Sequence, residues 1–312
     1  MSVYTDARSK PGNKTNAGSD ERELFLRGIA NMLLEAHAET VELEDHVFTK
    51  SISGGQSEKF PILGRKRGES EHVPGEIILG GGLESNEVEI SLDNMMYDAA
   101  FLAEVDELML TYDIAGPYAR QLGESLAVGS DKRRAIMHVL AARTSTPAYT
   151  GGPAGLRVTD ANMRTDPAKI EAAYFSAVEF INTNDISGKA KGFLPWKEYL
   201  LLSRYTGIDS EATSGSGDRS TGTTGLVAGI KPKGIIHIPV TNITTGPTKY
   251  RGNFTNCVGF ISTEMAVGRL KRRGLKLVIK KQDDRLGTLM IASQLEGHGV
   301  LRQECSVELA VS

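Results

Sequence analysis

Residues 66–82, KRGESEHVPGEIILGGG, limit the folds open to this chain more than any other segment. An extended segment over residues 47–63 precedes them, and an alternating run over residues 88–92, which predicts a β-strand, follows. The segment itself has neither helical nor strand periodicity, and it contains Pro74, Gly75 and a glycine triplet. These features predict a long hairpin with a glycine-rich tip. Because an isolated two-stranded hairpin is marginally stable in water, it needs another surface to lie on, and we expect another copy of the chain to supply it.

The remaining periodicities predict a mixture of helices and strands. The longest helix would span roughly 40 Å at 1.5 Å per residue and act as a spine. Apolar residues spaced by three and four predict helices over residues 21–39, 94–112, 114–142, 167–182 and 195–205, with Asp20, Asp113 and Asp166 as N-caps. Short apolar or alternating runs predict strands over residues 192–194, 234–240, 258–261, 275–279, 289–292 and 305–311.

Three segments of biased composition separate these elements. Residues 1–20 are polar and predict a flexible arm. Residues 144–155, TSTPAYTGGPAG, are a Thr/Pro/Gly linker and predict a domain boundary. Residues 209–225, DSEATSGSGDRSTGTTG, predict a low-complexity loop.

Composition excludes several classes of protein. The chain has 312 residues, enough for two modest domains or one large one, and its 40% hydrophobic and 24% charged residues are typical of a globular protein. The formal net charge of −3 argues against nucleic acid as a main partner, because phosphate binding needs a basic surplus. The cysteines, Cys257 and Cys305, are too few for a disulfide framework and indicate synthesis in a reducing cytoplasm. No apolar run reaches the roughly 20 residues that span a bilayer.

No candidate catalytic, cofactor-binding or metal-binding site emerges from the sequence. Residues 123–127, GESLA, resemble a nucleophile elbow, but Ser125 would stand in the middle of a helix instead of at a strand-to-helix turn. Residues 188–192, GKAKG, lack the spacing of a phosphate-binding loop. None of the six histidines has metal-ligand spacing to a cysteine or another histidine. We predict that His237 is a core histidine on a strand and that residues 297–299 form a tight turn.

A basic run lies near the C-terminus of the sequence. One interpretation is a nucleic-acid patch. The alternation of Leu275, Leu277 and Ile279 with Lys276 and Lys280 instead favours a strand with one buried and one solvated face. No aromatic residues interleave to stack bases, so we expect a strand edge or a contact between subunits. The run comprises Arg269, Lys271, Arg272, Arg273, Lys276, Lys280 and Lys281.

Several blocks of the sequence resemble the major capsid proteins of T-seven-like podovirus bacteriophages. Residues 51–65, SISGGQSEKFPILGR, are similar to the segment that enters the extended loop of that family. Residues 112–127, which end in QLGESLA, are similar to the start of the family's spine helix. Residues 266–268 and the block GHGVLR at residues 297–302 are similar to segments near the family's C-terminus. The blocks stand in the family's order, and residues 144–262 depart most from it.

The resemblance implies the Hong-Kong-97-type phage capsid fold, which is an α+β fold. That fold has an N-terminal arm, an extended loop, a peripheral domain with the spine helix and a long β-sheet, and an axial domain, whose loops meet around the five-fold and six-fold positions. The implied parts are an arm and its helix at residues 1–55, an extended loop at 56–90, a peripheral domain at 91–155 and 263–312 with its spine helix at about 114–142, and an axial domain at 156–262.

The function that the resemblance implies is that of a structural major capsid protein. It would self-assemble into the icosahedral head shell that encloses the phage genome, first as a procapsid that matures later. Its partners would be other copies of itself in hexamers and pentamers, a scaffolding protein, a portal protein and a decoration protein. It would enclose double-stranded DNA without specific binding. Assembly would take place in the cytoplasm of the host bacterium, and the product would reside in the virion, with no cofactor.

Two alternatives stay open from the sequence. One is an encapsulin-like cargo shell of the same fold, and the other is an α/β enzyme with an unrecognised site. For a shell protein, the extended loop and the arm are the segments expected to contact neighbouring subunits, through charges that pair across a boundary and glycines that let the loop bend. The candidate contact residues are Lys59, Arg65, Lys66, Arg67, Glu69, Glu71, Gly75, Gly80, Gly81, Gly82, Arg22 and Glu35.

Overall fold

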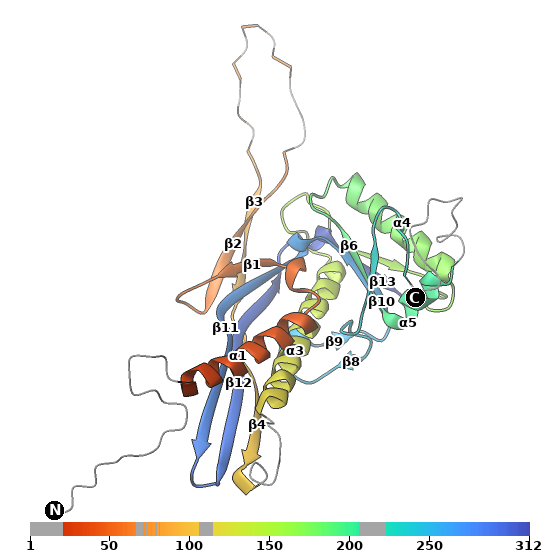
Figure 1. Ribbon diagram of the computed structural model, residues 1–312. Coiled ribbons are helices and arrows are strands. Elements are labelled where there is room, and N and C mark those ends of the chain that lie inside the picture. The colour runs from red at the N-terminus through yellow and green to blue at the C-terminus, as the bar shows by residue number, and fades with distance from the viewer. Residues whose placement is uncertain are drawn as a thin grey trace, which may run out of the picture. The chain divides into compact units, whose positions relative to one another are not determined.

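The computed structural model describes residues 21–66, 71–72, 74–75, 77–78, 80, 82–105, 115–205 and 223–312, with side chains from Ile29 onward. The chain divides into two compact units, and Figure 1 labels most of their helices and strands. Unit 1 comprises Met1–Val41, Met95–Val128 and Arg273–Gln294, and unit 2 comprises Glu42–Asn94, Gly129–Arg272 and Leu295–Ser312.

Unit 1 packs two helices against a sheet. Helix α1 (Glu21–Thr40) meets the first half of α3 (Ala115–Arg143), and both confirm predicted helices. A Cβ on Gly123 would lie 2.5 Å from the backbone oxygen of Leu33, so only glycine allows this approach. The sheet strands are β4 (Met96–Ala103) and parts of β11 (Val267–Gln282) and β12 (Gly287–Val300). The shared core contains Ile29, Leu33, Ala119, Leu122, Leu126, Met290 and Ala292.

The prediction of a helix over residues 94–112 is wrong where the structure describes it. Met96–Ala103 form β4, which pairs antiparallel with β12 along its full length. Even-numbered residues of β4 are at least partly buried, whereas the odd-numbered residues from Tyr97 to Phe101 are exposed. The apolar residues therefore also fit a period of two, and pairing with β12 decides in favour of the strand, because tertiary context overrides helix propensity. From residue 106 on, the predicted helix lies outside the described residues.

Unit 2 is built on a five-stranded sheet of order β5-β13-β10-β6-β7. Its outer pairs, β5 with β13 and β6 with β7, are parallel, and its central pairs are antiparallel. The strand β5 was not expected from the sequence, whereas the others match predicted strands in whole or in part. The strands are β5 (Leu156–Thr159), β13 (Ser306–Ala310), β10 (Cys257–Ser262), β6 (Lys191–Pro195) and β7 (Pro232–Ile235).

Helices cover both faces of this sheet. Side chains alternate along the strands, so Phe193 and Phe260 pack with the second half of α3, while Leu194 and Ile261 pack with α4 (Pro167–Thr183) and α5 (Trp196–Ser203). The predicted N-cap of α4 is confirmed, since the Asp166 side chain accepts a hydrogen bond from the backbone N–H two residues on, at 3.0 Å. A separate two-stranded sheet joins β8 (Asn242–Ile243) to β9 (Gly252–Asn253), and 3-10 turns cover Glu44–His46, Thr248–Tyr250, Glu264–Ala266 and Gln303–Cys305.

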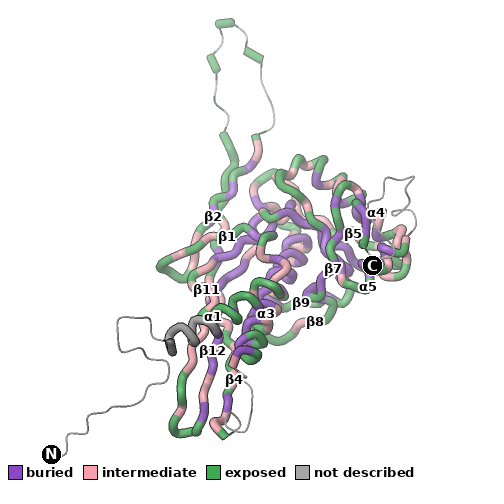
Figure 2. The backbone as a smooth tube through the Cα atoms, in the orientation of Figure 1, coloured by how far each residue is buried: buried purple, intermediate pink, exposed green. Residues whose placement is uncertain are grey.

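The predicted hairpin is confirmed in unit 2. Strand β2 (Ser57–Leu63) pairs antiparallel with β3 (Ser85–Ser91), and together they form a sheet of only two strands. The preceding strand β1 (Phe48–Ser51) pairs parallel with β11. Phe60, Ile90 and Leu270 bury their side chains in a small shared core, which holds the near end of the hairpin. Figure 2 shows that its described residues between Lys66 and Glu84 are exposed.

Two strand predictions need correction. Strand β7 ends at Ile235, and the rest of predicted strand 234–240 is irregular, with Ile236 76% exposed. His237 is buried, as expected, but it lies outside the strand. Strand pairing stops there because the parallel partner β6 ends at Pro195, which lies opposite Ile235.

The segment 297–299 forms no tight turn. It lies inside β12, where His298 is 1% exposed. A Cβ on Gly297 would lie 2.2 Å from the backbone oxygen of Ser91, so this glycine serves a close crossing of two backbones instead of a turn.

The strand predicted for the basic run is confirmed as part of β11, but the prediction that its basic residues are solvated is wrong for Arg269. Leu275, Leu277 and Ile279 pack on the core of unit 1, whereas Lys276 and Lys280 are exposed. Arg269 departs from the expected solvated face. Its side chain is 2% exposed and lies in a buried ionic cluster of unit 2.

Candidate functional site at the base of the hairpin

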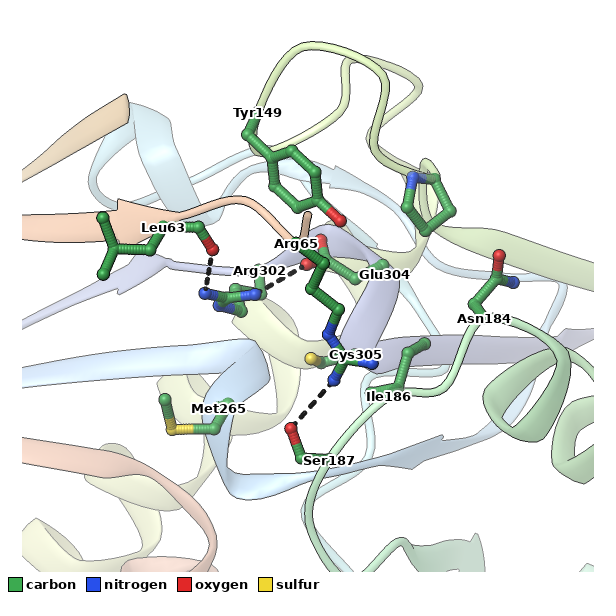
Figure 3. Close-up of a pocket in the computed structure, with 11 residues that line it drawn as sticks. Leu63, Arg65, Tyr149, Asn184, Ile186, Ser187, Met265, Arg302, Glu304 and Cys305 are labelled. Atoms are coloured by element: carbon green, nitrogen blue, oxygen red, sulfur yellow. Dashed lines mark hydrogen bonds and ion pairs between the residues drawn. The ribbon is translucent and has the colours of Figure 1, made fainter. Parts of the chain in front are cut away.

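A small pocket lies where the β2–β3 hairpin joins the rest of unit 2 (Figure 3). Its volume is about 150 Å³. The hairpin contributes Leu63 and Arg65, and the segment after β12 contributes Arg302 and Glu304. We refer to Leu63–Arg65 as the hairpin base.

Two hydrogen bonds to backbone carbonyl oxygens hold the hairpin base. The Gly64 N–H donates to the Glu84 carbonyl oxygen at 2.8 Å, one step beyond the strand ladder. Nη2 of Arg302 donates to the Leu63 carbonyl oxygen at 2.9 Å. The Tyr149 ring lies against Gly64, where a Cβ would come within 2.8 Å of a ring carbon. A side chain at this position would therefore push the hairpin away from Tyr149.

Arg65 ties the hairpin base to the turn that follows α4. Its Nη1 lies 2.6 Å from Asp185 Oδ2, and its Nη2 donates to Ser187 Oγ at 3.0 Å. Asp185 has a φ of 52°, a conformation that costs free energy for a residue with a side chain. Because the Asp185 side chain is 86% exposed, the ion pair stabilises the fold by at most about 1 kcal/mol. Together with the bond to Ser187, it joins the hairpin base to this turn.

The pocket contains no activated nucleophile. Burial raises the pKa of the Cys305 thiol to about 11, and burial likewise raises the pKa of Cys257 to about 12, so both thiols are protonated at neutral pH. Burial also raises the pKa of Glu304, whose Oε2 atom has no hydrogen-bond partner in the structure. Within the described residues, no three His, Cys, Asp or Glu side chains are grouped so that they could hold a metal ion. None of the helices that the structure describes is long and apolar enough to cross a membrane.

The structure places the predicted contact residues as follows. Lys59 lies on β2 and pairs with Glu87 of β3 at 2.8 Å, so it has a partner inside the hairpin. Arg65 likewise pairs inside the chain. Gly75 has a φ of 99°, which only glycine adopts readily. The remaining described residues of the set, Lys66, Glu71, Gly80, Gly82 and Glu35, are exposed. Arg67, Glu69, Gly81 and the side chain of Arg22 lie outside the described residues.

Sequence reasoning missed the residues that hold the hairpin base. Asp185 and Ser187 lie far from Arg65 along the chain, in a turn with no recognisable motif. Arg302 ends the block GHGVLR, which resembled the capsid family, but the block gave no indication of its partner Leu63. Tyr149 lies in the segment predicted to be a linker. Only the folded chain brings these residues together.

A buried ionic cluster stabilises unit 2 below the hairpin. Arg269 makes two hydrogen bonds to the Glu296 carboxylate, at 2.8 and 2.7 Å, and one to Glu44 at 2.7 Å. Arg134 lies 2.9 Å from Asp131 and 3.5 Å from Glu296. Burial acts to raise the pKa of Glu296, but hydrogen bonds and charge from Arg269, with the charge of Arg134, outweigh it and lower this pKa. The cluster is a fixed structural element, because each charge in it meets an opposite one.

Comparison with known proteins identifies what the chain is similar to. A family model described as Gp10A-like major capsid protein matches residues 59–310. The major capsid protein of Enterobacteria phage T3 is 23% identical over 329 aligned residues, which cover 94% of this chain and 93% of that protein. The major capsid protein of Escherichia phage T7 is 31% identical over 122 residues, which cover 38% of this chain and 35% of that protein.

A solved capsid gives the structural comparison. The capsid structure of the cyanophage P-SCSP1u superposes with a TM-score of 0.80 and 31% sequence identity. The match covers 97% of this chain and 98% of that one. The similarity therefore extends over both units and includes the hairpin.

Proposed function

This chain belongs to the Gp10A-like family of major capsid proteins, and we propose that its β2–β3 hairpin is the arm by which one copy joins the next. The chain is a structural protein of a bacteriophage capsid shell and has the Hong-Kong-97-type fold. Such a shell consists of many copies of one protein, which form multimers with each other. The function of the chain therefore depends on the contacts between copies.

The exposure of the hairpin is the observation that carries the proposal. Ile77 and Ile78, beyond the paired strands, are 86% and 78% exposed, and Leu83 is 49% exposed. Burying an exposed Leu or Ile side chain fully gains roughly 1.5–3 kcal/mol. A two-stranded hairpin offers no core of its own for them. The surface of another copy would bury these side chains and stabilise the hairpin at the same time.

The charged residues of the hairpin have two proposed roles. Lys59 pairs with Glu87 inside the hairpin, and Arg65 ties the hairpin base to Asp185; both are proposed to face a neighbouring copy as well. The remaining candidates are proposed to pair across the boundary between copies or to let the hairpin bend: Lys66, Arg67, Glu69, Glu71, Gly75, Gly80, Gly81 and Gly82, with Arg22 and Glu35 on α1.

The division into functional parts is proposed from the family resemblance. Residues 1–55 would be the arm, residues 56–90 the extended loop, residues 91–155 with 263–312 the peripheral domain and residues 156–262 the axial domain. The axial domains would meet in hexamers and pentamers. A scaffolding protein, a portal protein and a decoration protein are the further proposed partners, with assembly in the cytoplasm of the host bacterium around double-stranded DNA that the shell encloses without specific binding.

We propose no enzymatic activity for this chain. The buried thiols, with their raised pKa values, support this reading. An encapsulin-like shell of the same fold is the runner-up, and it differs by packaging an enzyme cargo and by needing no scaffolding protein. Analysis of what co-purifies with the particles separates the two.

Particle formation tests the proposal directly. Sedimentation velocity of the full-length chain, alone and with its co-expressed candidate scaffold, followed by negative-stain microscopy, should show closed particles of megadalton mass. Deleting residues 66–82 should abolish or strongly weaken them. A matched control keeps the length of the loop but replaces residues 71–82 with alternating Gly and Ser. If the apolar and charged side chains make the contact, this control should fail as the deletion does. Particles that form equally well without these side chains would refute the role of the hairpin.

A further inference from the structure

The outer face of α4, in unit 2, carries a protruding aromatic side chain. Phe175 is 55% exposed, and Glu171 and Glu179 stand one helical turn before and after it on the same stripe. Its neighbours Ala172 and Ser176 are small, and the Ser176 hydroxyl donates to the Ala172 carbonyl oxygen at 3.1 Å. The ring therefore stands clear of the helix between two carboxylates. We call Glu171, Phe175 and Glu179 the α4 knob.

An apolar groove opens on the same unit, beside the edge strand β7. Its volume is about 990 Å³. Trp196 and Leu226 line it and are 47% and 59% exposed, while Tyr199 and Ile230 are buried at 8% and 7%. Trp196 meets Tyr199 edge to face, with ring centroids 5.5 Å apart. Large apolar side chains this exposed around a concavity mark a surface that another group covers.

The rim of this groove is basic. Lys189 and Lys191 stand at the start of β6, and Lys231 and Lys233 stand at the start of β7, which is paired with it. All four lysines are exposed, and none of them forms an ion pair with another residue of the described chain. Glu42 is the acidic residue on the groove wall. Four positive charges against one negative charge favour an acidic, apolar occupant.

We propose that the α4 knob of one copy enters the groove of the next copy, with its two glutamates on the lysine rim. The knob matches the groove in both respects, because its centre is an aromatic ring and its flanks are carboxylates that form no ion pair within the described chain. Lysines around an exposed tryptophan would also suit single-stranded nucleic acid. The complementary knob on the same chain favours a second copy.

The positions of knob and groove make this contact head-to-tail. Helix α4 packs on β5 and β13, at one end of the sheet order, whereas the groove lies at β7, at the other end. A contact between two different surfaces of the same protein repeats from copy to copy and closes into a ring when the rotation allows. The inference rests on the proposed function, and it names the surfaces of one contact within a ring of subunits.

Charge reversal in the full-length chain tests the contact. Glu171→Lys with Glu179→Lys reverses the knob, and Lys231→Glu with Lys233→Glu reverses the groove. Each reversal alone should raise the protein concentration at which particles form by about tenfold or more, because like charges then face each other. The chain that carries all four changes should assemble close to the wild type, since the charges are again complementary.

Two substitutions of Phe175 test the aromatic part of the contact. Phe175→Ala should weaken assembly by about tenfold, as expected for an aromatic anchor, whereas Phe175→Leu should keep most of it. The inference is overturned, and the proposed function stands, if the wild type forms particles and all these variants form them at the same protein concentration. It is also overturned if the variant with all four charge changes needs as high a concentration as the two double variants. Loss of bound single-stranded nucleic acid without loss of assembly would also overturn it. A wild type that forms no particles would overturn both.

Discussion

Replacing Arg269 with Met should strongly destabilise unit 2. Arg269 is 2% exposed and makes two hydrogen bonds to Glu296 and one to Glu44. Methionine has a similar length but leaves the Glu296 carboxylate buried, with Arg134 at 3.5 Å as its remaining cation. Removing one partner of a buried ion pair costs about 3–5 kcal/mol, and Arg134 compensates only part of the charge that is left on Glu296. Lys280→Met, on an exposed position of the same strand, should cost about 0.5 kcal/mol or less.

Thermal unfolding of the unassembled chain measures this effect. The melting temperature should fall by on the order of 10 °C for Arg269→Met. The difference should shrink as the pH falls toward 4. In the wild type, the lowered pKa of Glu296 stabilises the folded state above the ordinary pKa of a glutamate, and this stabilisation is lost as the pH falls through the folded pKa. In the variant, burial acts on Glu296 with only the weaker charge of Arg134 against it, so acid protonates the carboxyl more readily and removes the penalty.

A double variant separates lost charge from lost packing. Arg269→Met combined with Glu296→Met replaces both ends of the pair with apolar groups, and Arg134 keeps Asp131 as its partner at 2.9 Å. It should be more stable than Arg269→Met alone. An Arg269→Met variant with the same melting temperature as the Lys280→Met control would refute the reasoning. A double variant with a lower melting temperature than Arg269→Met would refute it as well.

Three further predictions follow from single residues. Gly297→Ala should destabilise the chain by about 1–3 kcal/mol or more, because its Cβ would lie 2.2 Å from the Ser91 oxygen, whereas Gly80→Ala, with no atom within 4 Å, should leave the melting temperature unchanged. Asp166→Ala should remove the N-cap of α4 and cost about 1 kcal/mol in denaturant unfolding. Glu304→Gln should raise the melting temperature at neutral pH. Burial raises the Glu304 pKa, so the ionised form is penalised there, and the gain should vanish as the pH falls toward 4.

The sequence predicts those parts of the fold that local patterns determine. Helix α4 follows from Asp166, Pro167 and a regular apolar stripe, all of which act within the helix itself. The hairpin follows from two extended runs around a glycine-rich segment, since neither run needs a distant partner to be recognised. The function followed from a family resemblance, because a shell protein has no constellation of catalytic residues to identify it.

Local sequence patterns do not predict the structure where contacts between residues far apart in the chain determine it. Strand β4 carries apolar residues that fit both periods, and only pairing with β12 makes it a strand. The segment 297–299 has the composition of a turn, but Gly297 allows a close crossing of backbones and Gly299 makes room for the Ile90 side chain. Arg269 stands among solvated basic residues, and its burial depends on Glu296. The contacts of the hairpin base could not be predicted for the same reason, since Arg65 meets Asp185 only in the folded chain.

A cryo-electron microscopy map of the assembled particle would show directly which surface covers the hairpin. We expect residues 57–91 of each subunit to lie against a different copy, with Ile77 and Ile78 buried in that contact. A hairpin that folds back on its own subunit, or side chains of Ile77 and Ile78 that face solvent in the closed shell, would contradict its role as the arm between copies.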